Sequence, residues 1–473
     1  MKILNYTWII GVILVPMILI APVVYFVPQG EAKIDNPWQY MPKRLPKTNH
    51  VDLLDGPFED GPSVTKACVE CHEEVTEQIL HTAHWKWESD PVQVEGRSQP
   101  IALGKKNALN NFCIGIQSNW PPCTACHAGY GWVDETFDFS NPANIDCLVC
   151  HDNSGMYAKA NGGYPADGVD LVSVAQSVGG TTRQNCGTCH FLGGGGNAVK
   201  HGDLDETLYH PSERIDVHMG KHDFVCTDCH QTEKHVIKGR SISVSLDDKN
   251  QIYCTDCHAD SLHDDQRINN HMQKVACQSC HIPVVAIKNA TKTHWDWSTA
   301  GQDIPEDVHE YLKIKGSFKY EKGLVPEYYW YSGTAAHYLL GDKIDPSKTI
   351  LMNEPHGDIN DPNAKIWPFK VHRAKQIYDV KNNYLLQPKT FGEGGFWTEF
   401  DWDKSAMLGS EVVDLDYSGQ YDFIDTEMFW PITHMVASKD KVLQCVDCHG
   451  KNGNRMDWLA LGYEGDPLHY GSR

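Results

Sequence analysis

Apolar residues form one long run near the start of the chain and only short, irregular patches after it. Trp8 to Val27 is a stretch of 20 residues without a charged side chain, and Lys2 precedes it. A membrane-spanning helix needs about 20 apolar residues, whereas the apolar core of a cleaved signal peptide has about 7–15 and ends at a small-residue site. The pattern therefore predicts an uncleaved transmembrane anchor at residues 1–28. Because positive charge stays on the cytoplasmic side, we expect the rest of the chain on the periplasmic, or extracytoplasmic, side of the cytoplasmic membrane.

Three later segments also have a recognisable pattern. Residues 29–62 are rich in proline and indicate an extended linker. Residues 73–82 (EEVTEQILHT) have the clearest helical periodicity beside a cysteine motif. Residues 299–430 are enriched in aromatic side chains, which is typical of a packed satellite that covers the rest of a domain. A wall of an active-site cleft or a subunit interface is the alternative for that segment.

Sixteen of the 17 cysteines fall into eight copies of one pentapeptide, Cys-x-x-Cys-His. The copies are Cys68/Cys71/His72, Cys123/Cys126/His127, Cys147/Cys150/His151, Cys186/Cys189/His190, Cys226/Cys229/His230, Cys254/Cys257/His258, Cys277/Cys280/His281 and Cys445/Cys448/His449. Composition alone gives about 0.03 copies in a chain of this length, so the repetition reflects chemistry rather than chance.

The spacing within this pentapeptide suits covalent attachment of haem. Two thiols three positions apart can add to the two vinyl groups of one haem, and the following imidazole can then bind the iron. Structural zinc sites pair one Cys-x-x-Cys with a distant second pair, ferredoxin clusters need closer cysteine runs, and disulfide frameworks do not repeat one pentapeptide eight times. We therefore predict eight covalently bound haem c groups.

The spacing between the motifs predicts the architecture. Seven motifs are crowded into residues 63–298, and the eighth lies in residues 431–473. So dense a set leaves little room for an aliphatic core, and the haem array is expected to serve as the core instead. We predict a mainly α-helical octahaem domain over residues 63–473, with short helices around the motifs, many irregular loops, little sheet, and a haem-free segment at 299–430.

The charge balance restricts the partners. The chain has 41 Lys and Arg against 62 Asp and Glu, a formal charge of −21. Nucleic acid is excluded as a partner, because a phosphate backbone requires a basic surface. An anionic substrate would need a local reversal of sign at its site, since the propionates of eight haems add negative charge. The basic candidates for that reversal are Lys105, Lys106, Arg183, Lys200 and His201.

Distal iron ligands can come from the histidines outside the motifs. An iron with two His ligands transfers electrons, whereas a catalytic iron needs an open or displaceable position. The candidates beside motifs are His84, His218, His235, His263, His271 and His434, with His201 as a weaker seventh and His50, His81, His210, His222 and His294 behind it.

Several stretches of the sequence resemble the octahaem tetrathionate reductase family of multihaem c-type cytochromes. They are GPSVTKACVECH (61–72), HTAHWKWE (81–88), NNFCIGIQSNWPPCTACHAGYGW (110–132), NCGTCHFLGGGGNAVKHGDLD (185–205) and WDWSTAG (295–301). The resemblance implies a mostly α-helical multihaem fold related to hydroxylamine oxidoreductase and the pentahaem nitrite reductases. It also implies seven haems with two His ligands and one catalytic haem with a distal lysine.

The resemblance assigns the catalytic haem to the second motif, which ends in His127. Lys200 is the residue that matches the distal lysine best, and the same VKHGDLD stretch contributes His201 and Asp203 to the expected catalytic site. The alternatives for the lysine are Lys105, Lys106 and Lys159.

Cys113 is the one cysteine outside the motifs, ten residues before Cys123. It is either a small buried hydrophobic residue or a thiol beside the catalytic haem, where a thiolate could attack a sulfur–sulfur bond.

These expectations describe a membrane-anchored octahaem reductase that converts tetrathionate to thiosulfate at the lysine-ligated haem. The alternatives are a nitrite or hydroxylamine reductase, an enzyme similar to hydroxylamine oxidoreductase, and a non-catalytic electron conduit whose eight irons all have two His ligands. The expected partners are a redox donor (the quinol pool, or a quinol-oxidising or cytochrome partner), a small sulfur or nitrogen oxyanion, and the membrane through the N-terminal helix. A homo-oligomer is left open.

Overall fold

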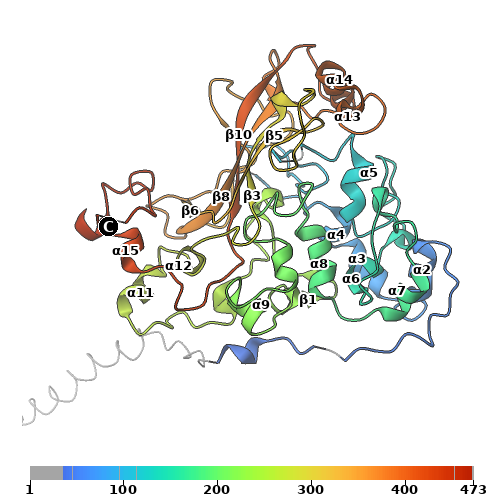
Figure 1. The fold of residues 1–473 in the computed structure, drawn as a ribbon, viewed down its shortest axis with the longest axis horizontal. Helices are drawn as coiled ribbons and strands as arrows, with labels where there is room; N and C mark the ends of the chain where they lie inside the picture. The colour runs from blue at the N-terminus through green and yellow to red at the C-terminus, as the bar shows by residue number, and fades with distance from the viewer. Residues whose placement is uncertain (1–35, 45, 95, 113, 452, 471–473) are drawn as a thin grey trace, which may run out of the picture. The chain divides into compact units, whose positions relative to one another are not determined.

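The computed structural model describes residues 36–470 except 45, 95, 113 and 452 (Figure 1). The chain divides into two compact units. The described part of the smaller unit is residues 36–41 with Tyr253–Asn269, and it contains the 3-10 turns η1 (Pro37–Tyr40) and η7 (Cys254–Asp256). The larger unit, Pro42–Ile252 with Asn270–Arg473, contains the other seven motifs.

Each Cys-x-x-Cys-His motif lies on or beside a short helical turn. Besides η7, these turns are α2 (Gly61–Val69), α5 (Trp120–Cys123) with η2 (Thr124–Cys126), α6 (Leu148–His151), α8 (Arg183–His190), α10 (Cys226–Cys229), α12 (Cys277–His281) and α15 (Cys445–Cys448). In three motifs an Asp precedes the second cysteine, and its carboxylate accepts the backbone N–H of the residue before the first cysteine. The donor–acceptor distances are 2.7 Å for Val225 and Asp228, 3.0 Å for Tyr253 and Asp256, and 2.6 Å for Gln444 and Asp447.

The other helices are also short. They are α3 (Val75–Leu80), α4 (Ala83–Lys86), α7 (Leu171–Ser177), α9 (Val217–Lys221), α11 (Gln266–His271), α13 (Phe396–Glu399), α14 (Trp402–Val412) and α16 (Pro467–Tyr470), with the 3-10 turns η3 (Pro142–Asn144), η4 (Asn161–Gly163), η5 (Glu206–Tyr209), η6 (Ile242–Val244) and η8 (Trp297–Thr299). Helices this short are marginal on their own, so packing must stabilise them.

An eight-stranded sheet is formed by strands of the predicted haem-free segment and by β3 (Thr291–Asp296), which immediately precedes it. Its strands are β3 (Thr291–Asp296), β4 (Tyr311–Leu312), β5 (Gly316–Glu321), β6 (Glu327–Tyr331), β7 (Ile350–Leu351), β8 (Lys365–Asp379), β9 (Tyr384–Leu385) and β10 (Tyr421–Pro431). The order is β4-β5-β3-β8-β10-β7, and β6 and β9 also pair with β8. Strands β1 (Thr232–Glu233) and β2 (Val236–Ile237) form a separate hairpin.

Strands β8 and β10 form the centre of this sheet. They are antiparallel and paired along the whole of β10, from Tyr421 opposite Asp379 to Pro431 opposite Phe369. Figure 1 shows them running side by side as long ribbons. Strand β3 runs parallel to β8, with His294 opposite Arg373.

The sheet has a hydrophobic core made of side chains. Trp295 stacks on Trp297 with ring centroids 4.5 Å apart, and Phe396 of α13 stacks on Trp402 of α14 at 3.7 Å. These rings and Trp430 belong to one cluster of buried residues. Because each buried aromatic side chain removes a large apolar area from water, this part of the chain folds around its own side chains rather than around porphyrins.

The prediction of a mainly α-helical fold with an N-terminal transmembrane helix is wrong. Among the described elements the longest helix, α14, has 11 residues, whereas β8 has 15. Strand β8 is buried along almost its whole length, and aromatic and β-branched residues favour strands. The aromatic enrichment of residues 299–430 therefore reflects a buried sheet and not irregular packing between helices.

The predicted localisation at the cytoplasmic membrane is also contradicted. Within the part of the chain that the structure describes, no helix has the length and apolar character needed to cross a membrane. The predicted anchor, residues 1–28, lies outside the described residues.

Candidate active site

The motif cysteines bring several haem attachment points together. Hydrogen bonds join the thiols of Cys68 and Cys147, of Cys126 and Cys189, and of Cys186 and Cys226. Motifs one and three, two and four, and four and five are therefore immediate neighbours. Haems bound through these sulfurs would be close neighbours, with the second motif adjoining the fourth.

Four motif histidines face a second imidazole at the distance expected when one iron lies between the two rings. A metal–imidazole bond is about 2.0 Å, and a ring nitrogen lies about 1.1 Å from the ring centre, so rings on opposite sides of one iron have centroids about 6.2 Å apart. The observed separations are 6.1 Å for His190 and His84, 6.4 Å for His151 and His235, 6.3 Å for His230 and His434, and 6.2 Å for His449 and His271. The donor set therefore fits four irons, each with two imidazole ligands.

Hydrogen bonds at Nδ1 orient several of these imidazoles. Nδ1 lies 2.8 Å from Gly179 O in His151, 2.9 Å from Lys238 O in His230, and 2.6 Å from Asp466 Oδ1 in His449. Among the facing rings, Nδ1 of His235 lies 2.9 Å from Gln78 Oε1, and Nδ1 of His434 lies 3.3 Å from Asp203 Oδ2. A partner at Nδ1 leaves Nε2 for a metal and fixes the ring orientation.

The histidine of the first motif is exposed. His72 follows α2, and its backbone N–H donates to Cys68 O at 3.0 Å. Among the described residues no aromatic or imidazole ring packs against the His72 ring, although its charge acts on His235, which faces His151. The structure therefore shows no facing imidazole for His72 in the described ranges, and its predicted role as an iron ligand stays a prediction.

The sixth motif belongs to the smaller unit, apart from the other seven. Cys254 is exposed, whereas Cys257 and His258 are half-buried. The backbone N–H groups of Cys257 and His258 donate to Cys254 O at 3.3 and 2.9 Å, so the motif forms a tight turn that presents its thiols and imidazole together. This turn suits haem attachment locally. Cys257 as an attachment point and His258 as an iron ligand stay predictions.

For the other predicted distal histidines the structure describes the following contacts. His218 packs against Phe224 with ring centroids 5.6 Å apart, and the backbone N–H and C=O of His263 bond the side-chain amide of Asn269. Of the weaker candidates, His81 pairs with Glu77 at 3.0 Å, His50 contacts Thr48 O at 3.1 Å, and His294 contacts Thr293 Oγ1 at 3.0 Å. His210 is exposed, and the ring of His222 lies 6.5 Å from that of Phe224. Their roles as ligands stay predictions.

The second motif has aromatic rings where the four paired motifs have an imidazole. His127 is fully buried, and the rings around it in the described structure are Trp85, Trp87, Trp132, Phe137 and Phe139, with centroids 4.9–6.1 Å away. Its Nε2 lies 2.7 Å from Trp85 O, and its Nδ1 is a buried atom without a partner. Burial lowers the pKa of His127 to about 3, so the ring is neutral.

Lys159 holds the backbone of this motif. Its ammonium donates to His127 O at 2.5 Å and to Gly129 O at 3.2 Å, and it forms an ion pair with Asp146 at 2.6 Å. The Lys159 and Asp146 side chains are 4% and 0% exposed. Because all three ammonium protons have acceptors, Lys159 is not available as an iron ligand.

Lys200 lies in an aromatic pocket after the turn that follows α8. Gly194 and Gly195 have φ values of 83° and 92°, which lets the chain turn back on itself. The part-buried Lys200 ammonium lies 4.6 Å from the Trp430 ring and 5.9 Å from the Phe112 ring. Burial, with a smaller contribution from the charge of Lys105, lowers the pKa of Lys200 to about 8, which favours the neutral amine that binds iron.

Lys105 connects this pocket with His127. Its ammonium lies 4.0 Å above the Trp87 ring, which contacts His127. The charge of Lys105 acts on both Lys200 and His127. The other predicted basic candidates are engaged elsewhere, because Lys106 pairs with Glu88 at 3.2 Å and Arg183 with Asp223 at 2.9 Å.

Asp203 contacts His434, the imidazole that faces the fifth motif, whereas His201 packs against the Trp430 ring that the Lys200 ammonium also contacts. Asp203 Oδ2 accepts the backbone N–H groups of Thr433 and His434, and Oδ1 lies 3.9 Å from His201 Nδ1. Although burial raises the pKa of Asp203, its contacts with His434 outweigh burial and bring the value to about 2. Asp203 therefore stays ionised and supports the imidazole of His434. Cys113 lies outside the described residues.

Four buried polar residues of the sheet were missed by the sequence reasoning. They are Thr291, Lys292, Lys370 and His372, with exposures of 0–3%. The ammonium of Lys292 lies 3.5 Å from the ring centroids of Trp295 and Phe318, and His372 Nδ1 lies 3.1 Å from Asn111 Oδ1. Lys370 and His372 are two residues apart, so recognising 365–379 as a strand would have placed both on one face.

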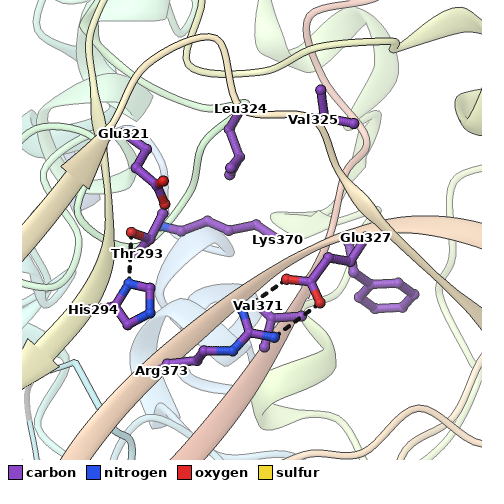
Figure 2. Close-up of a pocket in the computed structure, with 10 residues that line it drawn as sticks. Thr293, His294, Glu321, Leu324, Val325, Glu327, Lys370, Val371 and Arg373 are labelled. Atoms are coloured by element: carbon purple, nitrogen blue, oxygen red, sulfur yellow. Dashed lines mark hydrogen bonds and ion pairs between the residues drawn. The ribbon is translucent and has the colours of Figure 1, made fainter. Parts of the chain in front are cut away.

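A small cleft lies on the same part of the sheet (Figure 2). Arg373 makes two hydrogen bonds to Glu327, at 2.8 and 3.0 Å, and a third to Glu427 at 3.0 Å. Figure 2 shows the Lys370 side chain reaching from β8 toward Thr293 of β3. The charges that line the cleft are therefore paired within the protein rather than displayed to an anion.

Comparisons with known proteins agree with this donor set. A family model described as "Cytochrome c bacterial" matches residues 292–452. A crystal structure of an octaheme cytochrome c from Shewanella oneidensis is 49% identical, with a TM-score of 0.84 over 89% of this chain and 98% of that one. An uncharacterized protein of Archaeoglobus fulgidus is 24% identical over 229 residues, which are 38% of this chain and 76% of the relative.

The fold, the eight motifs and the paired imidazoles define a multihaem c-type cytochrome with covalently bound haem c. The chain belongs to the octahaem cytochromes c, and its predicted membership of the octahaem tetrathionate reductase-like family is confirmed.

Proposed function

We propose that this octahaem cytochrome is a reductase of small oxyanions, with tetrathionate as its substrate and the haem of the second motif as its catalytic centre. Lys200 would be the displaceable distal ligand there. The seven other haems, each with two His ligands, would transfer electrons.

The observation that carries this proposal is the difference between His127 and four other motif histidines. Those four face an imidazole at the distance set by one iron, whereas the rings that contact His127 are all Trp or Phe. A haem that only transfers electrons needs two strong ligands, and a catalytic haem needs a position that substrate can take. An amine is a suitable occupant of that position because it binds iron when neutral and leaves when protonated.

The charges near Lys200 support an anionic substrate. Lys105 is exposed and carries its charge toward both Lys200 and His127, in a chain whose formal charge is −21. A local positive region in a negative protein concentrates anions at one place on the surface.

The reaction needs two electrons and no proton. The central sulfur–sulfur bond of tetrathionate accepts both electrons and breaks, and two thiosulfate dianions leave. The bound haems would supply these electrons. The protein's own part is to exclude water with the aromatic rings around His127, to attract the dianion with Lys105, and to hold the Lys200 amine where substrate can displace it.

Electrons would come from a small redox protein or a quinol-oxidising partner. The eighth motif offers an exposed entry point, since Val446, between its two cysteines, is 70% exposed. Cys445 and Cys71 are exposed as well.

The test is a substrate comparison on the purified holoprotein with a reduced dye as the electron donor. The proposal predicts turnover of tetrathionate to two thiosulfates, and cyanide binding at one haem that competes with turnover. Turnover of nitrite or hydroxylamine without tetrathionate would leave the catalytic haem but replace the substrate. No turnover and no cyanide binding would overturn the proposal in favour of an electron conduit.

A further inference from the structure

The segment that presents Lys200 is held by its backbone carbonyl groups. Thr291 Oγ1 donates to Ala198 O at 2.7 Å and lies 3.2 Å from His201 O. Lys370 Nζ donates to Val199 O at 2.8 Å, to Lys200 O at 3.1 Å and to Thr291 Oγ1 at 2.6 Å. Two side chains therefore contact four consecutive carbonyl groups, from residue 198 to residue 201.

Both of these side chains come from the rigid centre of the sheet. Thr291 begins β3 and Lys370 lies within β8, each three residues before the paired His294 and Arg373. Their exposures are 0% and 1%. Burying the polar Nζ of Lys370 is costly unless it is hydrogen-bonded, and its contacts with Val199 O, Lys200 O and Thr291 Oγ1 meet that condition.

These contacts maintain an unusual backbone conformation at Ala198. Ala198 has a φ of 57°, in the left-handed region that alanine rarely adopts, and it is 1% exposed. Such a conformation persists when surrounding contacts determine it. The hydrogen bond from Thr291 to Ala198 O is one of those contacts, two residues before Lys200.

We infer that Lys370 and Thr291 are positioning residues that fix the backbone of residues 198–201 and so present the Lys200 amine to the haem of the second motif. This inference rests on the proposed function, because it takes Lys200 as the distal ligand. Lys370 itself does not bind substrate, because its side chain is buried and all three contacts of its Nζ lie within the protein. Loosening the segment does not remove the Lys200 amine. It lowers the fraction of molecules in which that amine is positioned to bind the iron.

The test compares the oxidised holoproteins of Thr291→Val and Lys370→Met with the wild type. Thr291→Val keeps nearly the same shape and removes only the hydroxyl, so it remains informative if Lys370→Met does not fold. Lys343→Met is the control, because Lys343 also donates to a backbone carbonyl, that of Asn382 at 2.6 Å, but at an exposed site.

Electron paramagnetic resonance and near-infrared magnetic circular dichroism are the readouts. We expect both variants to lose part of the His/amine signal and gain high-spin iron, while the signals from haems with two His ligands stay unchanged. Cyanide should bind several-fold more tightly, because it competes with a less well-placed amine. The control should match the wild type.

Two results would overturn the inference. The first is a wild-type His/amine signal and cyanide affinity in both variants. The second is an equal loss of the signals from His/His haems, which would indicate a general structural role. Failure of the proposed function is distinguishable, because Lys200→Ala would then leave the wild-type spectrum unchanged.

Discussion

The fifth and second motifs have the same pentapeptide but different surroundings. At the fifth, His230 faces His434 at 6.3 Å, and the Nδ1 atoms contact Lys238 O and Asp203. At the second, aromatic rings surround His127, and its Nε2 contacts a backbone carbonyl instead. The motif thus marks where a haem is attached, and under the proposed function the surrounding residues determine whether its iron transfers electrons or is open to chemistry.

The two sites also differ in how firmly their proposed iron ligands are held. The imidazoles at the fifth motif have their second nitrogen fixed by an acceptor, which makes a rigid and strong ligand pair. The proposed ligand at the second motif is an amine on a flexible stem, whose pKa is lowered to about 8 by burial. Rigid pairs suit electron transfer without rearrangement, and a single displaceable amine suits substrate binding.

Removing the proposed amine is the strongest way to break this comparison. Lys200→Ala should convert one haem to high spin and lower kcat/KM for tetrathionate by about 100-fold or more, as expected for loss of a preorganised group at a reacting centre. The spectrum and the steady-state rates of the purified variant measure this. A low-spin spectrum and full activity would rule out Lys200 as the ligand.

Removing an imidazole from a rigid pair should produce the complementary effect. His235→Ala leaves His151 without its facing ring, so one His/His signal should be replaced by a high-spin signal while the His/amine signal remains. Activity should fall by about 10-fold, the lower end for the loss of a supporting group at a metal site. Loss of the His/amine signal in this variant would show that the two kinds of site are not independent.

Reversing the charge of Lys105 tests whether local positive charge attracts substrate to the second motif. Lys105→Glu should raise KM by about 5-fold with little change in kcat, and the effect should shrink at high salt. Lys106→Glu is the control, because Lys106 already pairs with Glu88. Equal effects of the two substitutions would indicate a diffuse surface potential rather than a site at Lys105.

The smallest effect concerns a carboxylate beside an electron-transfer haem. Asp466 Oδ1 lies 2.6 Å from His449 Nδ1. Although burial raises the pKa of Asp466, the hydrogen bonds from Gly450 N–H and His449 bring it to about 2. Asp466→Asn removes this negative charge, so the potential of one haem should rise by tens of millivolts, where about 59 mV corresponds to 1.4 kcal/mol for one electron. An unchanged redox titration would show that this carboxylate does not tune the haem.

The chemistry of this chain was easier to predict from sequence than its fold. Eight identical motifs define the covalent attachment, because the spacing of two thiols and an imidazole is local. Facing histidines such as His434 were identifiable as candidates, but their partners depend on contacts between distant segments. The sheet was missed because β8, buried along almost its whole length, lacks the simple alternation of a strand with one face in water. Lys370 was missed with it, since its role depends on a strand register that no local pattern reveals.

The central claim is that seven irons have two His ligands and one has a His and an amine. Near-infrared magnetic circular dichroism of the fully oxidised holoprotein, with electron paramagnetic resonance, distinguishes these two ligand sets directly. The account predicts one His/amine signature beside the His/His signatures, and its disappearance in Lys200→Ala. A spectrum with only His/His signatures in the wild-type protein would contradict it.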